Sequence, residues 1–351
     1  MPRYRISSIK KPSESRVWYE YPNQVDGTYG VQMGDSEQPS KIGRRTSPTE
    51  TQVDQYESDV DGNRTKHTDT LGRITKWQYD AATGMDLLSV KQQNGAADET
   101  LTTYTYNPAD PLRRPRTITD ASGQTTTYSW NVRGQITGIT QPGALVTTWN
   151  YNPAGYLTSV DGPLAGTSDT TSFTYDLYGR IRTTTSPGSY TLTNDYDALD
   201  RPTLVTYPDG TKEQFSYQRP DGTKILDLTH YKDRENRWTF FGYNALRQRI
   251  ATVDSLNRTI RVNWCYCGAL QDLYDGEGNR TKWDYDIGGR LLRKTYADNT
   301  QHNYTYDLAG RPSTITDAKG QVKTHGYHTD GQLSGITYTN SQKPTANVSF
   351  T

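Results

Sequence analysis

The chain has 351 residues, and its 39 Lys and Arg residues balance its 39 Asp and Glu residues. A net charge of zero without a basic patch argues against a nucleic-acid or anionic-membrane partner, because both usually select positive charge. Leu, Ile, Val and Phe make up only 55 of the 351 residues, whereas Tyr and Trp contribute 27 and 7. An ordinary aliphatic core is therefore not expected, and no stretch is apolar for long enough to span a bilayer.

The first segment is rich in Pro, Ser and Lys, so we expect residues 1–55 to be irregular or to cap the edge of the first strand. No apolar signal-peptide segment is visible in it. The stretch ESDVDGN then places Glu57, Asp59 and Asp61 before a Gly, as at the start of a calcium loop. Position twelve of such a loop falls on Thr68, and GNRTK recurs after Asp275 as part of an ordinary repeat turn, so an ordinary turn is expected instead.

From about residue 56 to residue 339, the chain repeats a phrase in which an aromatic residue precedes Asp or another polar residue, two further residues, Gly, and Arg or Gln. The clearest copies start at Tyr285, Tyr306 and Tyr327, which are 21 residues apart. Wider steps contain additions such as PLAGTSDT, which are expected to be loops. We predict about twelve units over residues 56–339 and a tail or truncation point at 340–351.

Two sets of residues define the repeat. The aromatic positions predicted to be equivalent are Tyr79, Tyr106, Trp130, Tyr151, Tyr175, Tyr196, Tyr217, Tyr243, Tyr285, Tyr306 and Tyr327. The glycines predicted to end the turns are Gly134, Gly155, Gly179, Gly289, Gly310 and Gly331. Both sets are expected to serve the structure of the repeat, and the ligand-binding residues, if there are any, stay unknown at this stage.

Each unit is predicted to contain two short strands and two turns. In TKWDY, Thr281, Trp283 and Tyr285 alternate with charged residues, which is the period of a strand with one covered face. Asp-x-x-Gly suits a tight turn, because Asp caps the backbone and Gly accepts a positive φ. One such hairpin cannot cover its aromatic face alone. We therefore predict an all-β fold in which antiparallel hairpins form one long curved or spiralling sheet, with Arg residues packed on tyrosine rings.

The returning strands depart from strict alternation. Ile136 and Ile139 are three residues apart, as are Pro312 and Ile315. Either a β-bulge intervenes or both faces of the strand are partly covered, and the sequence leaves both possibilities open.

The residue types most often found in metal or redox sites give no clear site. Cys265 and Cys267 are expected to be two small side chains on a strand, where a disulfide between residues two apart would be strained. His325 and His328 have a metal-like spacing only on a helix, and here they fall on a strand and a turn. No metal site is therefore predicted.

The Tyr-Asp-x-x-Gly-Arg phrase, at a step near 21 residues, resembles the YD or Rhs repeat of bacterial Rhs polymorphic toxins, the cocoon subunits of Tc toxins and animal teneurins. The resemblance covers about residues 56–339 and implies a partial YD/Rhs β-shell. In bacterial relatives such a shell encloses a C-terminal toxin. The chain reaches Thr351 without the Asp-Pro-x-Gly-Leu junction at which relatives cleave themselves. The resemblance therefore implies a short member of the family or a segment of a longer protein.

Two functions remain open. The resemblance implies a non-catalytic, encapsulating scaffold that is secreted or associated with the cell surface, with a C-terminal toxin or further repeats as its partner. Alternatively, aromatic and Arg side chains form a surface that recognises a glycan or a surface protein. No phosphate loop, serine nucleophile or isolated pair of carboxylates stands out. We therefore predict no catalytic residue and no cofactor, and we do not expect an enzyme.

Overall fold

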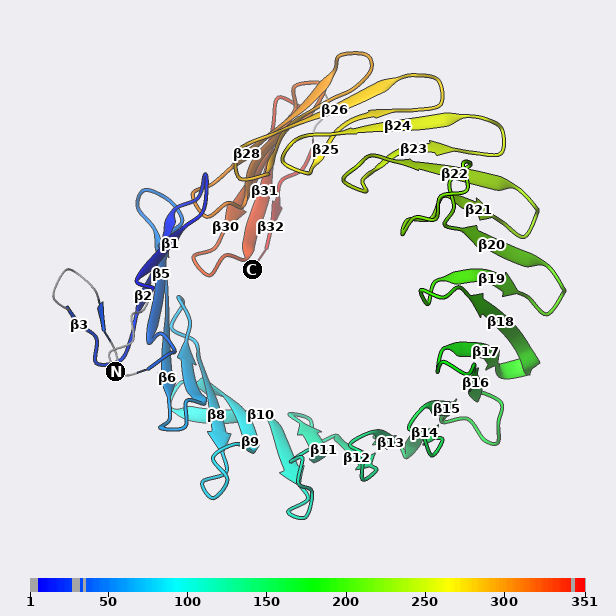
Figure 1. Ribbon diagram of the computed structural model, residues 1–351. Helices are drawn as coiled ribbons and strands as arrows, with labels where there is room; N and C mark the ends of the chain where they lie inside the picture. Colours follow the sequence, from blue (N-terminus) through cyan, green and yellow to red (C-terminus); the bar gives the residue numbers. More distant parts are fainter. Residues whose placement is uncertain (1–5, 27–31, 34–35, 342–344, 351) are drawn as a thin grey trace. The chain divides into compact units, whose positions relative to one another are not determined.

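The computed structural model describes residues 6–26, 32–33, 36–341 and 345–350. Within these ranges, 30 strands form one antiparallel sheet, and β3 and β4 form a separate pair (Figure 1). The helical structure in the same ranges is limited to the 3-10 turn η1 (Pro187–Ser189). The predicted all-β fold of antiparallel hairpins is confirmed. In the described part of the chain, no helix has the length and apolar character needed to cross a membrane.

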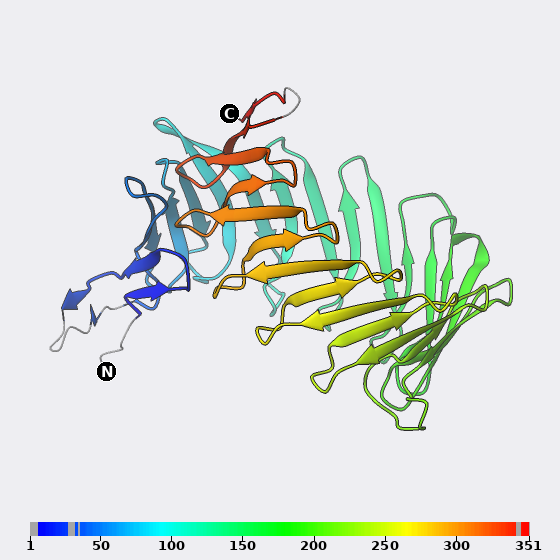
Figure 2. The ribbon, with the colours of Figure 1, turned by 90° about the horizontal axis from the view of Figure 1, so that it is seen from above.

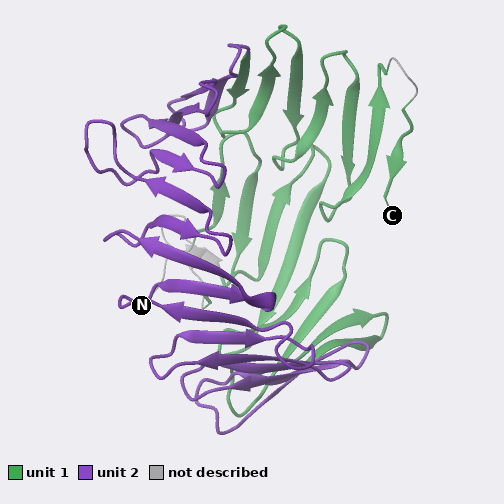
Figure 3. Ribbon diagram, turned by 90° about the vertical axis from the view of Figure 1, so that its right-hand side faces the viewer, with its two compact units in different colours: residues 1–103, 280–351 green, residues 104–279 purple. Residues whose placement is uncertain are grey.

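The chain divides into two compact units, residues 1–103 with 280–351 and residues 104–279 (Figure 3). The first unit contains β1 (Ser8–Lys10), β2 (Arg16–Glu20), β3 (Val25–Asp26), β4 (Gln32–Met33), β5 (Lys41–Arg45), β6 (Thr51–Ser58), β7 (Arg64–Thr68), β8 (Ile74–Tyr79), β9 (Leu87–Asn94), β26 (Arg280–Tyr285), β27 (Leu291–Thr295), β28 (Gln301–Tyr306), β29 (Pro312–Thr316), β30 (Val322–Tyr327), β31 (Leu333–Thr339) and β32 (Val348–Ser349). β10 (Ala97–Tyr106) crosses the boundary between the units.

The second unit contains β11 (Pro115–Asp120), β12 (Thr125–Trp130), β13 (Ile136–Gln141), β14 (Leu145–Tyr151), β15 (Leu157–Asp161), β16 (Thr171–Tyr175), β17 (Ile181–Ser186), η1, β18 (Tyr190–Tyr196), β19 (Pro202–Thr206), β20 (Lys212–Ser216), β21 (His230–Lys232), β22 (Trp238–Tyr243), β23 (Arg249–Val253), β24 (Thr259–Trp264) and β25 (Leu270–Tyr274). These units are defined by packing, so the limits proposed from the repeat at residues 56 and 339 remain predictions.

From β5 to β10, from β11 to β25 and from β26 to β32, strands that follow one another in the chain are neighbours in the sheet. β28 pairs with β27 on one side and with β29 on the other, in both cases antiparallel. Figure 2 shows the alternating directions of the strands in the orange part of the chain. This arrangement follows from the short turns, because an antiparallel neighbour is the partner that a tight turn can supply.

A β-bulge recurs where most of the repeat phrases begin. Tyr128 pairs with Ile139, but Trp130 pairs with Ile136, so the returning strand contains one extra residue. The same shift occurs in β26 with β27, β28 with β29, and β30 with β31. The bulge explains why apolar residues of the returning strands lie three apart, which the sequence left open.

Burial is shallow in the described residues. Tyr21 and Ala309 are the only apolar side chains in these ranges that are less than 9% exposed, and no large side chain is completely buried. All eleven aromatic residues at the head of the repeat phrase are half-buried. The tyrosines therefore supply apolar area over a sheet that has little aliphatic core.

The segment before the repeats also contributes strands. β2 pairs with β1 and β5, and β5 pairs with β6, the strand in which the first repeat begins. At the other end, β32 pairs with β31. Residues 27–31, 34–35 and 342–344 of the two predicted terminal segments lie outside the described residues, as do residues 1–5 and 351.

Within the first unit, residues that are remote in sequence meet. The backbone N–H of Ser15 donates to the carbonyl oxygen of Leu308 over 2.6 Å. The guanidinium of Arg73 lies 2.9 Å from the carboxylate of Asp330, whose side chain is only 9% exposed. The turns of the last repeats therefore pack against strands and turns from the start of the chain.

Candidate functional site

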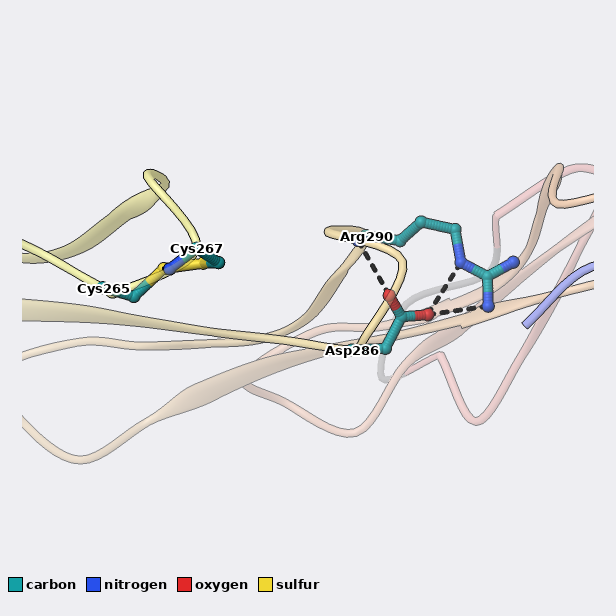
Figure 4. The surroundings of a disulfide bond; sticks show 4 residues. All are labelled: Cys265, Cys267, Asp286 and Arg290. Carbon is teal, nitrogen blue, oxygen red and sulfur yellow. Dashed lines mark hydrogen bonds and ion pairs between the residues drawn. A yellow bond between two sulfur atoms is a disulfide. The ribbon is translucent and has the colours of Figure 1, made fainter. Parts of the chain in front are cut away.

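The repeat phrase folds as a turn that is closed by its own Asp and Arg. The Oδ1 atom of Asp286 accepts the backbone N–H groups of Gly288 and Arg290, over 2.8 and 2.9 Å. Its Oδ2 atom accepts a hydrogen bond of 2.8 Å from Nε of Arg290 (Figure 4). The N–H of Gly289 donates to the carbonyl oxygen of Asp286 over 3.0 Å, and Gly289 has a φ of 79°. One carboxylate thus holds both the backbone and the arginine of its turn.

The same arrangement recurs along the sheet. Asp and Arg four residues apart form an ion pair in the turns Asp69–Arg73, Asp110–Arg114, Asp176–Arg180, Asp197–Arg201, Asp233–Arg237, Asp254–Arg258 and Asp307–Arg311. The sequence analysis identified the capping Asp but missed this ion pair. The signal was present, because Asp and Arg keep a constant spacing in the phrase.

The arginine of one turn covers the aromatic ring of the next repeat. The guanidinium carbon of Arg290 lies 4.6 Å from the ring centre of Tyr306, and that of Arg311 lies 4.1 Å from Tyr327. The equivalent pairs elsewhere are Arg114 with Trp130, Arg180 with Tyr196, and Arg201 with Tyr217. In each pair the ring comes 16 residues after the arginine. Cation–π contacts therefore join consecutive repeats.

The hydroxyl of that aromatic residue makes a second link to the preceding repeat. Tyr306 donates to the carbonyl oxygen of Leu291 over 2.8 Å, and Tyr327 donates to that of Pro312 over 2.8 Å. The same bond joins Tyr151 to Ile136, Tyr175 to Leu157, Tyr196 to Ile181 and Tyr243 to Leu228. Indole N–H groups replace the hydroxyl where Trp130 bonds to Pro115 and Trp264 to Arg249. Sequence reasoning missed this bond, because it depends on the bulge.

The predicted turn glycines adopt the backbone conformation that the turn requires. The φ angles are 86° at Gly134, 93° at Gly155, 81° at Gly179, 79° at Gly289, 80° at Gly310 and 89° at Gly331. Side chains other than glycine rarely adopt this left-handed region, although Asp200 and Arg247 do so in two of the other turns.

Hydrogen bonds from the turn arginines favour the ionised form of Asp110 and Asp197. Both oxygens of Asp110 accept hydrogen bonds of 2.8 Å from Arg114, and these bonds lower the pKa of Asp110 to about 2 although the carboxyl is buried. The hydrogen bond from Arg201 likewise lowers the pKa of Asp197. Burial raises the pKa of Tyr285, so its phenol stays protonated at neutral pH. These groups are stabilised as ion pairs and donors, away from the pKa range that general acid–base catalysis uses.

The calcium-like sequence forms a repeat turn. Oδ1 of Asp59 accepts the N–H groups of Asp61 and Asn63 over 3.0 and 2.8 Å, which is the capping pattern of Asp286. In the described part of the chain, no three His, Cys, Asp or Glu residues are grouped as metal ligands.

One histidine and one aspartate form a close pair in the first unit. Nε2 of His67 lies 2.8 Å from Oδ1 of Asp54, and its ring stacks on Tyr56 at 4.7 Å. The pair lines a polar groove that also contains Arg73 and Asp330. Within the described residues, no hydroxyl or thiol group is hydrogen-bonded to His67, so the pair lacks the nucleophile of a catalytic triad.

The two cysteines differ from the expectation. Cys265 and Cys267 lie in the turn between β24 and β25 and form a disulfide (Figure 4). The prediction of two separate side chains on a strand was wrong, because it assumed extended backbone. The turn brings the two Cα atoms to 5.2 Å, within the usual range for a disulfide.

Known proteins share both the repeat and the fold. The Teneurin YD-shell family matches residues 45–263. The chain resembles the structure of TcdB2-TccC3-Cdc42 with a TM-score of 0.67, and the Photorhabdus luminescens Tc holotoxin pore carrying a TccC3 mutation with a TM-score of 0.60. Each match covers 92% of this chain and 20% of the other, at 13% and 12% identity. These identities establish similarity of fold alone.

One curated relative matches a shorter stretch. The double-stranded DNA deaminase toxin A of Burkholderia cenocepacia (strain H111) is 35% identical over 97 residues, which is 28% of this chain and 6% of the toxin. The chain thus spans a small part of the length of the proteins it matches. The family match covers more than half of the chain and includes most of the repeated Asp–Arg turns, so the chain belongs to the Teneurin YD-shell family.

Proposed function

We propose that the chain is a wall segment of a β-shell that encloses a passenger, such as a C-terminal toxin, within a larger secreted protein. In this proposal the chain has no catalytic role, and its direct partners are the passenger and further repeats. Its membership of a shell-forming scaffold family supports this reading. Its similarity to one fifth of the TcdB2-TccC3 chains also fits a part of a larger assembly.

The observation that carries the proposal is the equivalence of the units. In the regular repeats, Asp, Arg and Tyr make the same contacts within the turn and to the neighbouring unit, as in Asp286, Arg290 and Tyr306. A wall needs continuity from one unit to the next, whereas a catalytic or ligand site needs one unit that differs from the others. The Asp, Arg and Tyr side chains, which often act in catalytic sites, here make structural contacts within the sheet.

The test is protease protection in the complete native protein. Where the reading frame continues beyond Thr351 into a domain without repeats, that domain should resist proteolysis while the repeats are intact. The double variant Arg290→Ala and Arg311→Ala, which removes two links between repeats, should make it sensitive. Lys319→Ala, an exposed substitution in a neighbouring turn, is the matched control. Equal digestion of the domain in all three proteins would contradict enclosure.

The alternative of a recognition surface is tested on the same protein. Glycan and surface-protein panels should give no tight ligand if the chain is a wall. Binding that Tyr306→Ala or Trp238→Ala abolishes while the variant retains its thermal stability would replace the wall with a recognition surface. A reading frame that stops at Thr351 would favour the same conclusion.

A further inference from the structure

The disulfide turn is a repeat turn in which the usual side-chain pair has been replaced. Aligning CYCGAL with DIGGRL places Cys265 at the position of Asp286 and Ala269 at the position of Arg290. The backbone is the same in both: Cys265 N–H donates to Ala269 O over 2.9 Å, and Gly268 N–H donates to Cys265 O over 3.0 Å. Both the capping carboxylate and the arginine are therefore absent from this turn.

The sulfur atom of Cys265 accepts one of the backbone hydrogen bonds that the carboxylate accepts in the ordinary turn. Sγ of Cys265 accepts the N–H of Cys267 over 3.1 Å, as Oδ1 of Asp286 accepts the N–H of Gly288 over 2.8 Å. The disulfide then joins these same two positions covalently. Sulfur is a weak acceptor, so the hydrogen bond alone is a poorer cap than a carboxylate.

The rest of this repeat does not depend on the disulfide. The indole N–H of Trp264 donates to Arg249 O over 2.9 Å, and Trp264 pairs with Leu270 across the usual bulge. These contacts and the two backbone bonds of the turn involve no sulfur atom. Opening the disulfide should leave the sheet in place.

The disulfide is also accessible. Cys267 is exposed, Cys265 is half-buried, and Tyr266 between them is fully exposed. A thiolate from solution can therefore approach Sγ of Cys267, and exposed disulfides are those most readily exchanged.

We propose that Cys265 and Cys267 form a thiol–disulfide exchange site for low-molecular-weight thiols of the glutathione class. The thiolate of one such molecule bonds to Sγ of Cys267, the S–S bond breaks, and Cys265 leaves as a thiolate that takes up a proton. A second thiolate attacks the outer sulfur of the mixed disulfide. Cys267 is released and protonated, and the small thiol departs as its own disulfide. Two electrons pass from the small thiols to the protein, and the reaction is reversible.

The experiment treats the oxidised 351-residue chain with reduced glutathione under native conditions, alkylates the product and measures its mass. We expect two alkylated cysteines, at Cys265 and Cys267. The melting temperature should change by less than about 4 °C, because the free energy of unfolding should change little when the disulfide opens. In Cys265→Ser, oxidised glutathione should form a mixed disulfide with Cys267. Alkylation that requires denaturant would overturn the proposal, as would two free thiols in the protein before reduction.

A second variant separates reactivity from folding. Cys265→Asp with Cys267→Gly and Ala269→Arg rebuilds the side-chain pair of the ordinary turn and removes both sulfur atoms. It should melt at or above the temperature of the native chain and show no change on addition of glutathione. A melting temperature of the native chain that falls by more than about 4 °C with glutathione, while that of this variant does not, would show that the disulfide supports the fold and would overturn the statement that the sheet does not depend on it.

Discussion

Residues 283–333 and residues 216–243 form similar hairpins with different side chains. In the first stretch, Asp286 caps its turn and its partner Arg290 covers Tyr306. In the second, Arg219 occupies the first position of the turn, with the same backbone bond from Gly222 N–H over 2.9 Å, and the carboxylate of Asp221 inside the turn accepts the N–H of Thr223 over 2.9 Å. The backbone of the turn is therefore independent of the Asp–Arg pair. The Asp–Arg pair instead positions the arginine that packs on the aromatic ring of the next repeat.

The second stretch gathers its own aromatic cluster. The ring of Phe240 lies 4.9 Å from His230 and 6.3 Å from Trp238, and both Trp238 and Phe240 remain partly exposed. Contacts between rings there add to the regular contacts between repeats, which this stretch keeps at Tyr217 and Tyr243. The comparison teaches that a unit can vary its turn and its surface aromatic residues while the contacts to its neighbours are kept.

The largest expected effect comes from removing an aromatic residue of the regular stretch. Tyr306→Ala deletes a half-buried ring, the contact with Arg290 and the bond to Leu291 O, and should lower the free energy of unfolding by about 2 to 3 kcal/mol. Trp238→Ala, in the irregular stretch, should cost about 1 kcal/mol because its ring is more exposed. Urea denaturation measures both. Equal losses of unfolding free energy for the two variants would contradict the difference between the two stretches.

A turn glycine should give the next largest effect. Gly289 has a φ of 79°, and a Cβ atom there would meet no atom within 4 Å, so Gly289→Val tests backbone strain without a clash. We expect a loss of about 1 to 2 kcal/mol. The same change at exposed Lys319 should cost less than about 0.5 kcal/mol. Comparable melting of the two variants would contradict the turn geometry.

Removing the arginine should have a smaller effect. The side chain of Arg290 is 19% exposed, and Arg290→Ala should cost about 1 kcal/mol by deleting its ion pair and its contact with Tyr306. Arg219→Ala, in the irregular stretch, should stay within about 0.5 kcal/mol of the native chain. Equal losses of unfolding free energy for Arg290→Ala and Arg219→Ala in urea would contradict the difference between the two stretches.

The pH dependence should reveal the capped carboxylates. The pKa of Asp110 is lowered to about 2, so the folded state favours the ionised carboxyl. Its stabilisation is complete above the unfolded value near 4 and is lost as the pH falls through about 2. Urea midpoints measured from pH 5 to pH 2 should fall more steeply for the native chain than for Asp110→Asn. Parallel curves would show that the carboxylate does not contribute.

Local features of the fold were predictable from the sequence. Alternation in TKWDY indicated a strand, and Asp-x-x-Gly indicated a turn, because both signals lie within a few neighbouring residues. The positive φ of Gly289 and Gly310 was expected on that basis and is confirmed. The period of 21 residues then indicated how the hairpins follow one another.

Features that depend on pairing between strands were not predictable. The bond from Tyr306 to Leu291 O requires the bulge, and the sequence left the bulge open. The contact of Arg73 with Asp330 joins residues 257 apart, and no local pattern indicates it. The disulfide was missed because Cys265 was assigned to a strand, although the aligned repeat places it in a turn.

The recurring bulge bears on how such a sheet can change in length during evolution. Most of the repeat aromatic residues bond to a carbonyl about one hairpin earlier, so duplication or deletion of a whole unit by recombination preserves these contacts between neighbours. Insertion of a single residue inside a hairpin would turn the following side chains to the opposite face. Growth of the chain is therefore expected in multiples of a complete unit, with smaller additions confined to loops such as residues 162–170.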